Sequence, residues 1–200
     1  MRPALRCIRF ACAAFASLLI GTTASAADPA PASAPKVLRG APMTRADADF
    51  LKQAAQSGHA EIEAGRIALT KGVNTQVKGF AQQMIDDHGR IASELAALAA
   101  AKGIELPHEA SVAQKAKIKL LAARDGGSFD RRFAETVGVA AHRDALRLFQ
   151  KAALGATDPE IKAFAAKAVP MLRLHLERAT ELKGVVDKEG NAKAPGDRKQ

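Results

Sequence analysis

The sequence predicts an all-α protein: a bundle of four long amphipathic helices, with a short extra helix in a crossover connection between the second and the third. Apolar residues recur at i, i+3, i+4 and i+7 through four long segments. These segments begin at residues that cap helices and end near glycines. About 140 residues lie between a Pro/Ala-rich leader and a charged tail, which is enough for one core. We therefore expect a single bundle domain over residues 44–183.

Cap residues set the expected helix bounds. Thr44 and Asp47 have the spacing of a capping box, and Asn74 is a favourable N-cap for the second helix. Asp158 precedes a proline and a glutamate, which marks the start of the fourth helix. Ser128 is expected to open the third. The four long helices are expected at 44–71, 74–103, 128–155 and 158–183. The short extra helix is expected at 111–126, between the second and the third long helix.

The first 26 residues have the pattern of an export signal. Three arginines precede an uncharged, largely apolar stretch over residues 10–21, and the small residues 24–26 predict cleavage after Ala26. The apolar stretch is shorter than the roughly 20 residues that a membrane-spanning helix needs. We therefore expect a periplasmic or secreted protein, with a flexible Pro/Ala-rich leader at 27–43 and a disordered charged tail at 184–200.

Removal of the signal would change the chemistry of the chain. Both cysteines, Cys7 and Cys12, lie in the signal, so the mature protein would have no thiolate ligand. The net charge would fall from +9 to +6, because the signal holds three arginines and no acid. Such a protein is expected to meet anionic envelope surfaces rather than nucleic acid, since it lacks Trp and Tyr for base stacking. Homo-oligomerisation is compatible with the sequence.

Each long helix carries one potential metal ligand on its apolar stripe: Glu61, His88, His142 and His175. A titratable group at a core position is unfavourable unless it is paired or ligated. With a crossover between the second and third helices, the four residues lie 13–17 positions from cap residues at one end of the bundle, or roughly 20–26 Å. A simple up-down bundle would spread them over roughly 9 Å of depth. The spacing therefore favours the crossover and one shared layer.

The third long helix has the least regular stripe. The line that best fits a helical period passes through Gly138, His142, Ala145, Leu146, Phe149 and Ala153. Phe133 and Leu148 lie to the side of this line, so the stripe is less clearly defined here than on the other three helices.

The chemistry of the four residues leaves several interpretations open. Three imidazoles and one carboxylate could hold one divalent ion, and Fe, Mn, Zn and Cu all accept such ligands. The same residues could form a metal-free hydrogen-bonded network that fixes the helix register, or a pH-responsive cluster. Without metal, the protein would be a structural or interaction module that contacts anionic envelope components or protein partners.

Four further residues are candidates for supporting roles around the cluster: Asp87, Glu135, Met84 and Met171. The two acids could orient imidazoles, whereas methionines at core spacing are usually filler. A di-iron centre of the usual kind is disfavoured, because the residues three before the histidines are Ile85, Val139 and Leu172, none of them acidic. The chain has no G-x-S-x-G, no Gly-rich phosphate loop and no H-E-x-x-H, so nothing indicates an enzyme with these motifs.

A resemblance to a known family spans essentially residues 46–182. Five strings carry it, in this order: SGHAEIEAGRIAL, VKGFAQQMIDDHGRIASEL, GIELP, FDRRFAETVGVAAHRDALRLF and DPEIKAFAAKAVPMLRLHLERA. They resemble the bacterial exported family labelled domain of unknown function 4142. The resemblance implies a ferritin-like helical bundle in the periplasm or outside the cell, with no established activity. It also implies that the family's recurring pattern includes Glu61, Asp87, His88, His142, Pro170 and His175. The chain departs at Ala141, where the pattern commonly has an acid.

Overall fold

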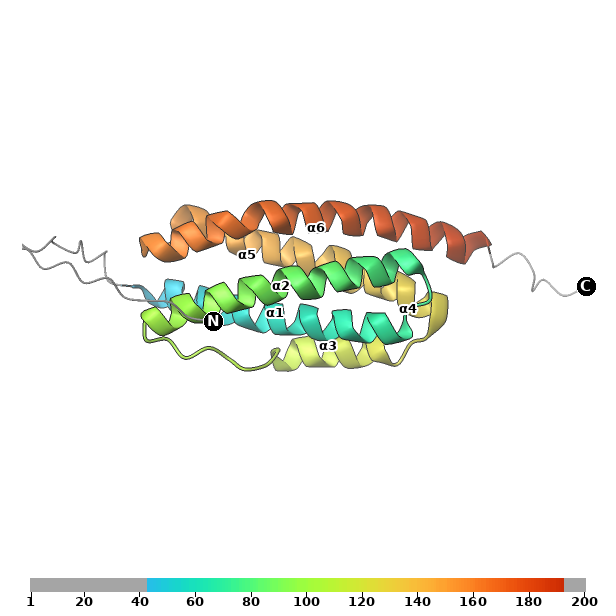
Figure 1. The fold of residues 1–200 in the computed structure, drawn as a ribbon, viewed down its shortest axis with the longest axis horizontal. Coiled ribbons are helices and arrows are strands. Elements are labelled where there is room, and N and C mark those ends of the chain that lie inside the picture. The colour runs from blue at the N-terminus through green and yellow to red at the C-terminus, as the bar shows by residue number, and fades with distance from the viewer. Residues whose placement is uncertain (1–42, 193–200) are drawn as a thin grey trace, which may run out of the picture. The chain divides into compact units, whose positions relative to one another are not determined.

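The computed structural model describes residues 43–192, which form helices and no strands. The elements are α1 (Arg45–Lys71), α2 (Thr75–Ala101), α3 (Val112–Ala122), α4 (Gly126–Phe133), the π-helix η1 (Ala134–Ala141), α5 (His142–Gly155) and α6 (Pro159–Ala192). Three of them, α4, η1 and α5, follow one another directly and make up the third long helix (Figure 1). The predicted helical bundle is confirmed. The predicted signal at 1–26, and the leader except for Met43, lie outside the described residues.

The connection between α2 and α4 crosses from one end of the bundle to the other, with α3 packed on α1 inside it (Figure 1). At one end, Asp130 of α4 accepts hydrogen bonds from the backbone N–H groups of Val73 and Asn74, in the α1–α2 turn, at 3.2 and 2.9 Å. At the opposite end, Asp47 of α1 accepts from two N–H groups of the α5–α6 turn at 3.1 and 3.3 Å. The third long helix therefore starts beside the α1–α2 turn, as the crossover requires.

The side-chain caps agree with the sequence at three helix starts. Thr44 and Asp47 form both hydrogen bonds of a capping box. The side chain of Asn74 accepts from two N–H groups at the start of α2, at 2.8 and 3.2 Å. Asp158 accepts from the N–H groups of Glu160 and Ile161 at 2.9 and 3.1 Å. Each cap satisfies amide groups that have no partner within the helix.

The start of the third long helix differs from the prediction at Ser128. The helix begins two residues earlier, at Gly126, whose φ of 56° lies in the left-handed region that glycine adopts without a Cβ clash. The chain therefore turns into the helix at this glycine. Ser128 lies inside the first turn, where its hydroxyl accepts from Arg124 at 3.2 Å.

The fourth helix extends beyond its predicted end at Lys183. Since α6 continues to Ala192, the prediction of a disordered tail is wrong for residues 184–192, and residues 193–200 lie outside the described part. Val186 lies one turn after the buried Leu182 and is itself buried, so the apolar stripe continues. Glu189 accepts two hydrogen bonds from the Asn74 amide, at 2.9 and 3.0 Å. These contacts hold a segment that looks polar in sequence against the bundle.

The π-helix η1 changes which residues of the third long helix face the core. Phe133 and His142 are nine residues apart, which on a regular α-helix puts them about 180° apart. Both side chains are nevertheless 0% exposed, because a π-helix has more residues per turn and shifts the phase of the helix after it. Phe133, which lies to the side of the predicted stripe, is therefore in the core, while Leu146 and Ala153 on the stripe are partly buried against one core cluster.

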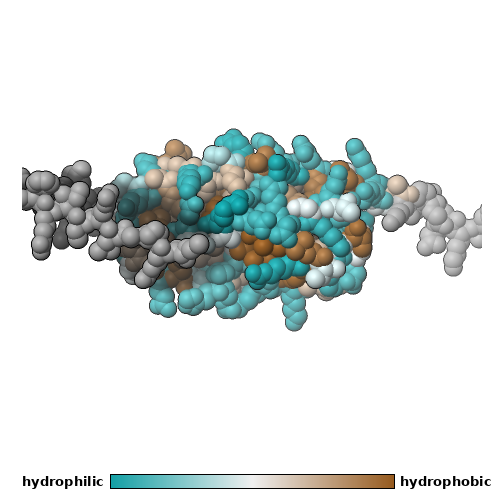
Figure 2. All heavy atoms as spheres, viewed as in Figure 1, coloured by the Kyte–Doolittle hydropathy of each residue, from teal (hydrophilic) through white to brown (hydrophobic). Residues whose placement is uncertain are grey.

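The apolar core consists of two clusters separated by a polar layer. One cluster includes Met84 and Phe133, and the other includes Phe50, Leu95 and Phe149. The four sequence-predicted ligands lie between these clusters along their helices. On the face that Figure 2 shows, hydrophilic side chains predominate and apolar areas lie between them. Among the described helices, none has the length and apolar content needed to cross a membrane.

Candidate metal centre

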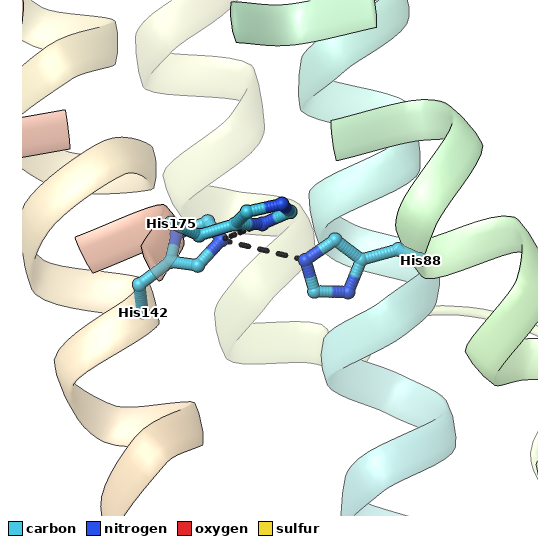
Figure 3. Close-up of side chains that lie close together, drawn as sticks. All are labelled: His88, His142 and His175. Atoms are coloured by element: carbon cyan, nitrogen blue, oxygen red, sulfur yellow. Dashed lines mark hydrogen bonds between the residues drawn. The ribbon is translucent and has the colours of Figure 1, made fainter. Parts of the chain in front are cut away.

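Three histidines from three long helices meet in the middle of the bundle. His88 comes from α2, His142 is the first residue of α5, and His175 comes from α6 (Figure 3). The Nε2 atom of His142 lies 3.4 Å from Nε2 of His88 and 3.2 Å from Nδ1 of His175. All three nitrogens lie within 4.8 Å of one another, and the three residues are buried. We call these three side chains the histidine triad.

Each imidazole of the triad uses its other ring nitrogen to donate to an acceptor outside the triad. The three pairs are His88 Nδ1 with Glu61 Oε2 at 3.1 Å, His142 Nδ1 with the Val137 carbonyl at 3.0 Å, and His175 Nε2 with Asp87 Oδ2 at 2.8 Å. Carboxylate and carbonyl oxygens are acceptors, so these outer nitrogens carry the protons. In neutral rings, the three inner nitrogens therefore present lone pairs to one another.

The surroundings of His88 and His175 favour the neutral form of these two imidazoles. Burial lowers the pKa of His88, and the opposing effect of the nearby Glu61 charge offsets this lowering only in part. Burial also lowers the pKa of His175 to about 4, against the opposing effect of its hydrogen bond to Asp87. Burial alone would raise the pKa of Asp87, but the hydrogen bond from His175 and the charge of Arg90 outweigh it, so this pKa is lowered. Asp87 is thus a charged acceptor that fixes the tautomer of His175.

The fourth predicted ligand, Glu61, lies behind His88 rather than at the inner nitrogens. Its side chain is 3% exposed, and its Oε2 accepts the Nδ1 proton of His88. Its second oxygen, Oε1, is buried and has no hydrogen-bond partner among the described residues. In this arrangement the carboxylate orients a histidine and retains unused acceptor capacity.

The four predicted supporting residues lie in different places. Asp87 contacts His175 directly, although its neighbour His88 points into the layer. Glu135 is half-exposed and pairs with Arg132 at 3.1 Å on the surface. Met84 is fully buried in one apolar cluster, and Met171 is partly buried against the other. Among these four, the structure brings only Asp87 into hydrogen-bond contact with the triad.

Two contacts of the triad could not be derived from the sequence pattern. The Val137 carbonyl is a backbone group inside η1, and the π-helical turn brings it within hydrogen-bond distance of Nδ1 of His142, five residues later. Phe80 packs its ring against His142 and His175, with centroid distances of 6.0 and 5.9 Å. Phe80 lies eight residues before His88 on α2, at a spacing typical of one helical face, whereas nothing in the sequence marks η1. An apolar wall and a backbone acceptor therefore complete the site.

Solved structures similar to this chain share its helical fold. One is a fragment of a DUF305 protein from Deinococcus radiodurans, with a TM-score of 0.63 and 16% identity, covering 74% of this chain and 99% of that one. Another is a candidate spore coat protein from Bacillus halodurans C-125, with a TM-score of 0.50 and 12% identity, covering 76% and 91%. At these identities the likeness concerns the fold alone.

Family membership is shown by sequence. No curated protein was found to match the chain. A family model, however, matches residues 32–182, which include every described helix up to Leu182 of α6. The chain belongs to the family described as a domain of unknown function, DUF4142.

Proposed function

We propose that this protein binds one divalent transition-metal ion through His88, His142 and His175. The observation that carries the proposal is the convergence of three inner nitrogens, each left with a lone pair by an outer hydrogen bond. Bare lone pairs facing one another at 3.2 and 3.4 Å repel, and a cation between them removes the repulsion. A tetrahedral ion with metal–nitrogen distances of 2.0–2.1 Å has nitrogen–nitrogen edges of roughly 3.3–3.4 Å. The two short edges of the triad fit this geometry.

The donor set narrows the choice of metal and its role. Neutral imidazole suits Zn, Fe(II), Mn and Cu, and none of the described residues offers a thiolate. The acceptors Glu61, Asp87 and Val137 hold the rings in place, as hydrogen-bond partners of metal-bound histidines commonly do. Three protein ligands leave at least one coordination position for water or another small ligand. We therefore propose a mononuclear centre with an open position.

Metal analysis tests this proposal. The protein, purified without a histidine tag, is expected to carry about one metal ion per chain, and the His88→Ala/His175→Ala variant to carry almost none. At a free metal concentration 100 times its Kd, bound metal is expected to raise the Tm by roughly 5–10 °C. Sub-stoichiometric metal in both proteins, with no thermal shift on adding Fe, Mn, Zn or Cu, would show instead a metal-free network in which the rings share a proton.

We also propose that the protein acts outside the cytoplasm, in the envelope. The basic, apolar and small-residue regions of residues 1–26 support export, and the family match begins at residue 32, after the predicted cleavage site. Intact-mass measurement of the protein recovered from its native host is expected to show a chain that begins at Ala27. A chain that retains residues 1–26 would contradict export by this route.

A further inference from the structure

A cavity of about 410 Å³ lies between α1, α2 and the connection that leads from α2 to α3. Its walls consist mostly of alanines and larger apolar side chains, among them Ala96, Leu95 and Phe149. Glu105 and His108 are exposed and lie at its rim. The lining extends inward to Glu61 and His88. The cavity therefore runs from the crossover connection to the outer side of the histidine triad. Its size is typical of sites for small organic molecules.

The connection over the cavity is held by a specific contact. The ring of His59 on α1 donates from Nε2 to the carbonyl of Pro107 at 3.2 Å. This hydrogen bond fixes the covering segment against α1 without filling the space beneath it, where Ile104 and Leu106 contribute apolar walls. The cavity thus has α1 and α2 on one side and the connection between α2 and α3 on the other.

The charges of the lining indicate which kind of molecule the cavity fits. The chain as a whole has 30 basic and 21 acidic side chains. Among the described residues, those that line this cavity nevertheless include two carboxylates, Glu61 and Glu105, and no Lys or Arg. Glu61 also retains a buried oxygen, Oε1, that has no partner within the described part of the chain. A buried acceptor without a partner is costly, and a charged donor satisfies it best.

We propose that this cavity is a binding site for an organic amine, with its apolar body between α1 and α2 and its ammonium group on the Glu61 carboxylate. A carboxylic acid of the same shape would place its negative charge against Glu61 and is therefore excluded. The site does not require the metal, because none of its binding contacts uses an inner nitrogen of the triad. Bound amine would contact the carboxylate that orients His88, so the two sites would be neighbours.

Calorimetric titration of the purified protein in the presence of EDTA tests the site independently of any metal. The probe is 4-phenylbutylamine, and the matched anion is 4-phenylbutanoate. Saturable one-to-one binding is expected for the amine and none for the anion. Glu61→Gln is expected to weaken amine binding by at least about tenfold, because it removes a charge-assisted hydrogen bond.

A matched pair of glycine variants separates this cavity from other surfaces. Gly58 lines the cavity, and Gly79 is not part of its lining within residues 43–192. At both positions an added Cβ would meet no atom of another described residue within 4 Å, apart from its own helical backbone. Gly58→Leu is expected to fill the space and abolish amine binding, while Gly79→Leu leaves it within about twofold of wild type. If Glu61→Gln does not fold, this pair still decides the question. The proposal is overturned by no saturable amine binding, by equal binding of the anion, or by unchanged binding to Gly58→Leu.

Discussion

Replacing His142 with alanine is expected to lower the affinity for Zn²⁺ by at least about 100-fold, beyond the 10–100-fold loss typical for removing an orienting partner. Both short nitrogen–nitrogen contacts of the triad share the Nε2 atom of His142. Without it, the nitrogens of His88 and His175 would be left as two ligands on separate helices. Competition with a chelator of known affinity measures the change.

Two further variants place this result in context. His108 is exposed and does not belong to the triad, so His108→Ala is expected to keep wild-type affinity for Zn²⁺. Asp87→Ala removes the acceptor of the His175 proton and the surface ion pair with Arg90 but leaves the three imidazoles in place, so a loss of about 10–100-fold is expected. Circular dichroism establishes that each variant keeps its helices. Wild-type Zn²⁺ affinity in a folded His142→Ala protein would show that the triad is not the metal site.

Replacing Asp130 with alanine is expected to lower the free energy of unfolding by about 2–4 kcal/mol. Asp130 is 2% exposed, and its carboxylate accepts from the backbone N–H groups of Val73 and Asn74. The substitution removes a charged acceptor and leaves two amides of the α1–α2 turn without it, next to a packed helix end. Urea denaturation of the metal-free protein measures this effect.

A neighbouring acid provides the control for Asp130. Asp125 forms an ion pair with Lys71 at 2.8 Å, but its side chain is 81% exposed, so Asp125→Ala is expected to change stability little. Asp130→Asn keeps one acceptor oxygen and is expected to fall between the two. Since Asp47 holds the turn at the opposite end, the effects of Asp47→Ala and Asp130→Ala should add. Equal stability of the Asp125→Ala and Asp130→Ala variants would rule out the proposed role of Asp130.

The fold was largely predictable from the sequence because its signals are local. Caps such as Thr44 and Asn74 and the 3.6-residue period define the helices, and the depths of the four polar residues indicated the crossover. The end of α6 was not fully predictable from the same signals, because the contacts that hold residues 184–192 include the side-chain amide of Asn74, in the distant α1–α2 turn. The contacts of Asp130 with the α1–α2 turn and of Asp47 with the α5–α6 turn are likewise tertiary, so they do not affect the local pattern of apolar residues.

The site was predictable in its members and not in its arrangement. The positions of His88, His142 and His175 on apolar stripes indicated that they share one layer, and the structure places them in contact. The sequence did not distinguish Glu61 as an orienting acceptor from Glu61 as a ligand, because that depends on side-chain geometry. The π-helix η1 turns His142 toward the core and supplies the Val137 carbonyl. The pattern of apolar residues in this segment does not predict a π-helix, so these two features were missed.

The central claim is that three imidazoles hold one metal ion between two apolar core clusters. X-ray absorption at the zinc edge of protein loaded with one equivalent of Zn²⁺ tests it most directly. The account predicts three imidazole nitrogens at about 2.0–2.1 Å with one further light-atom ligand, and the loss of one imidazole from any metal that the His142→Ala variant still binds. A spectrum that lacks imidazole scattering, or one unchanged by His142→Ala, would contradict the account.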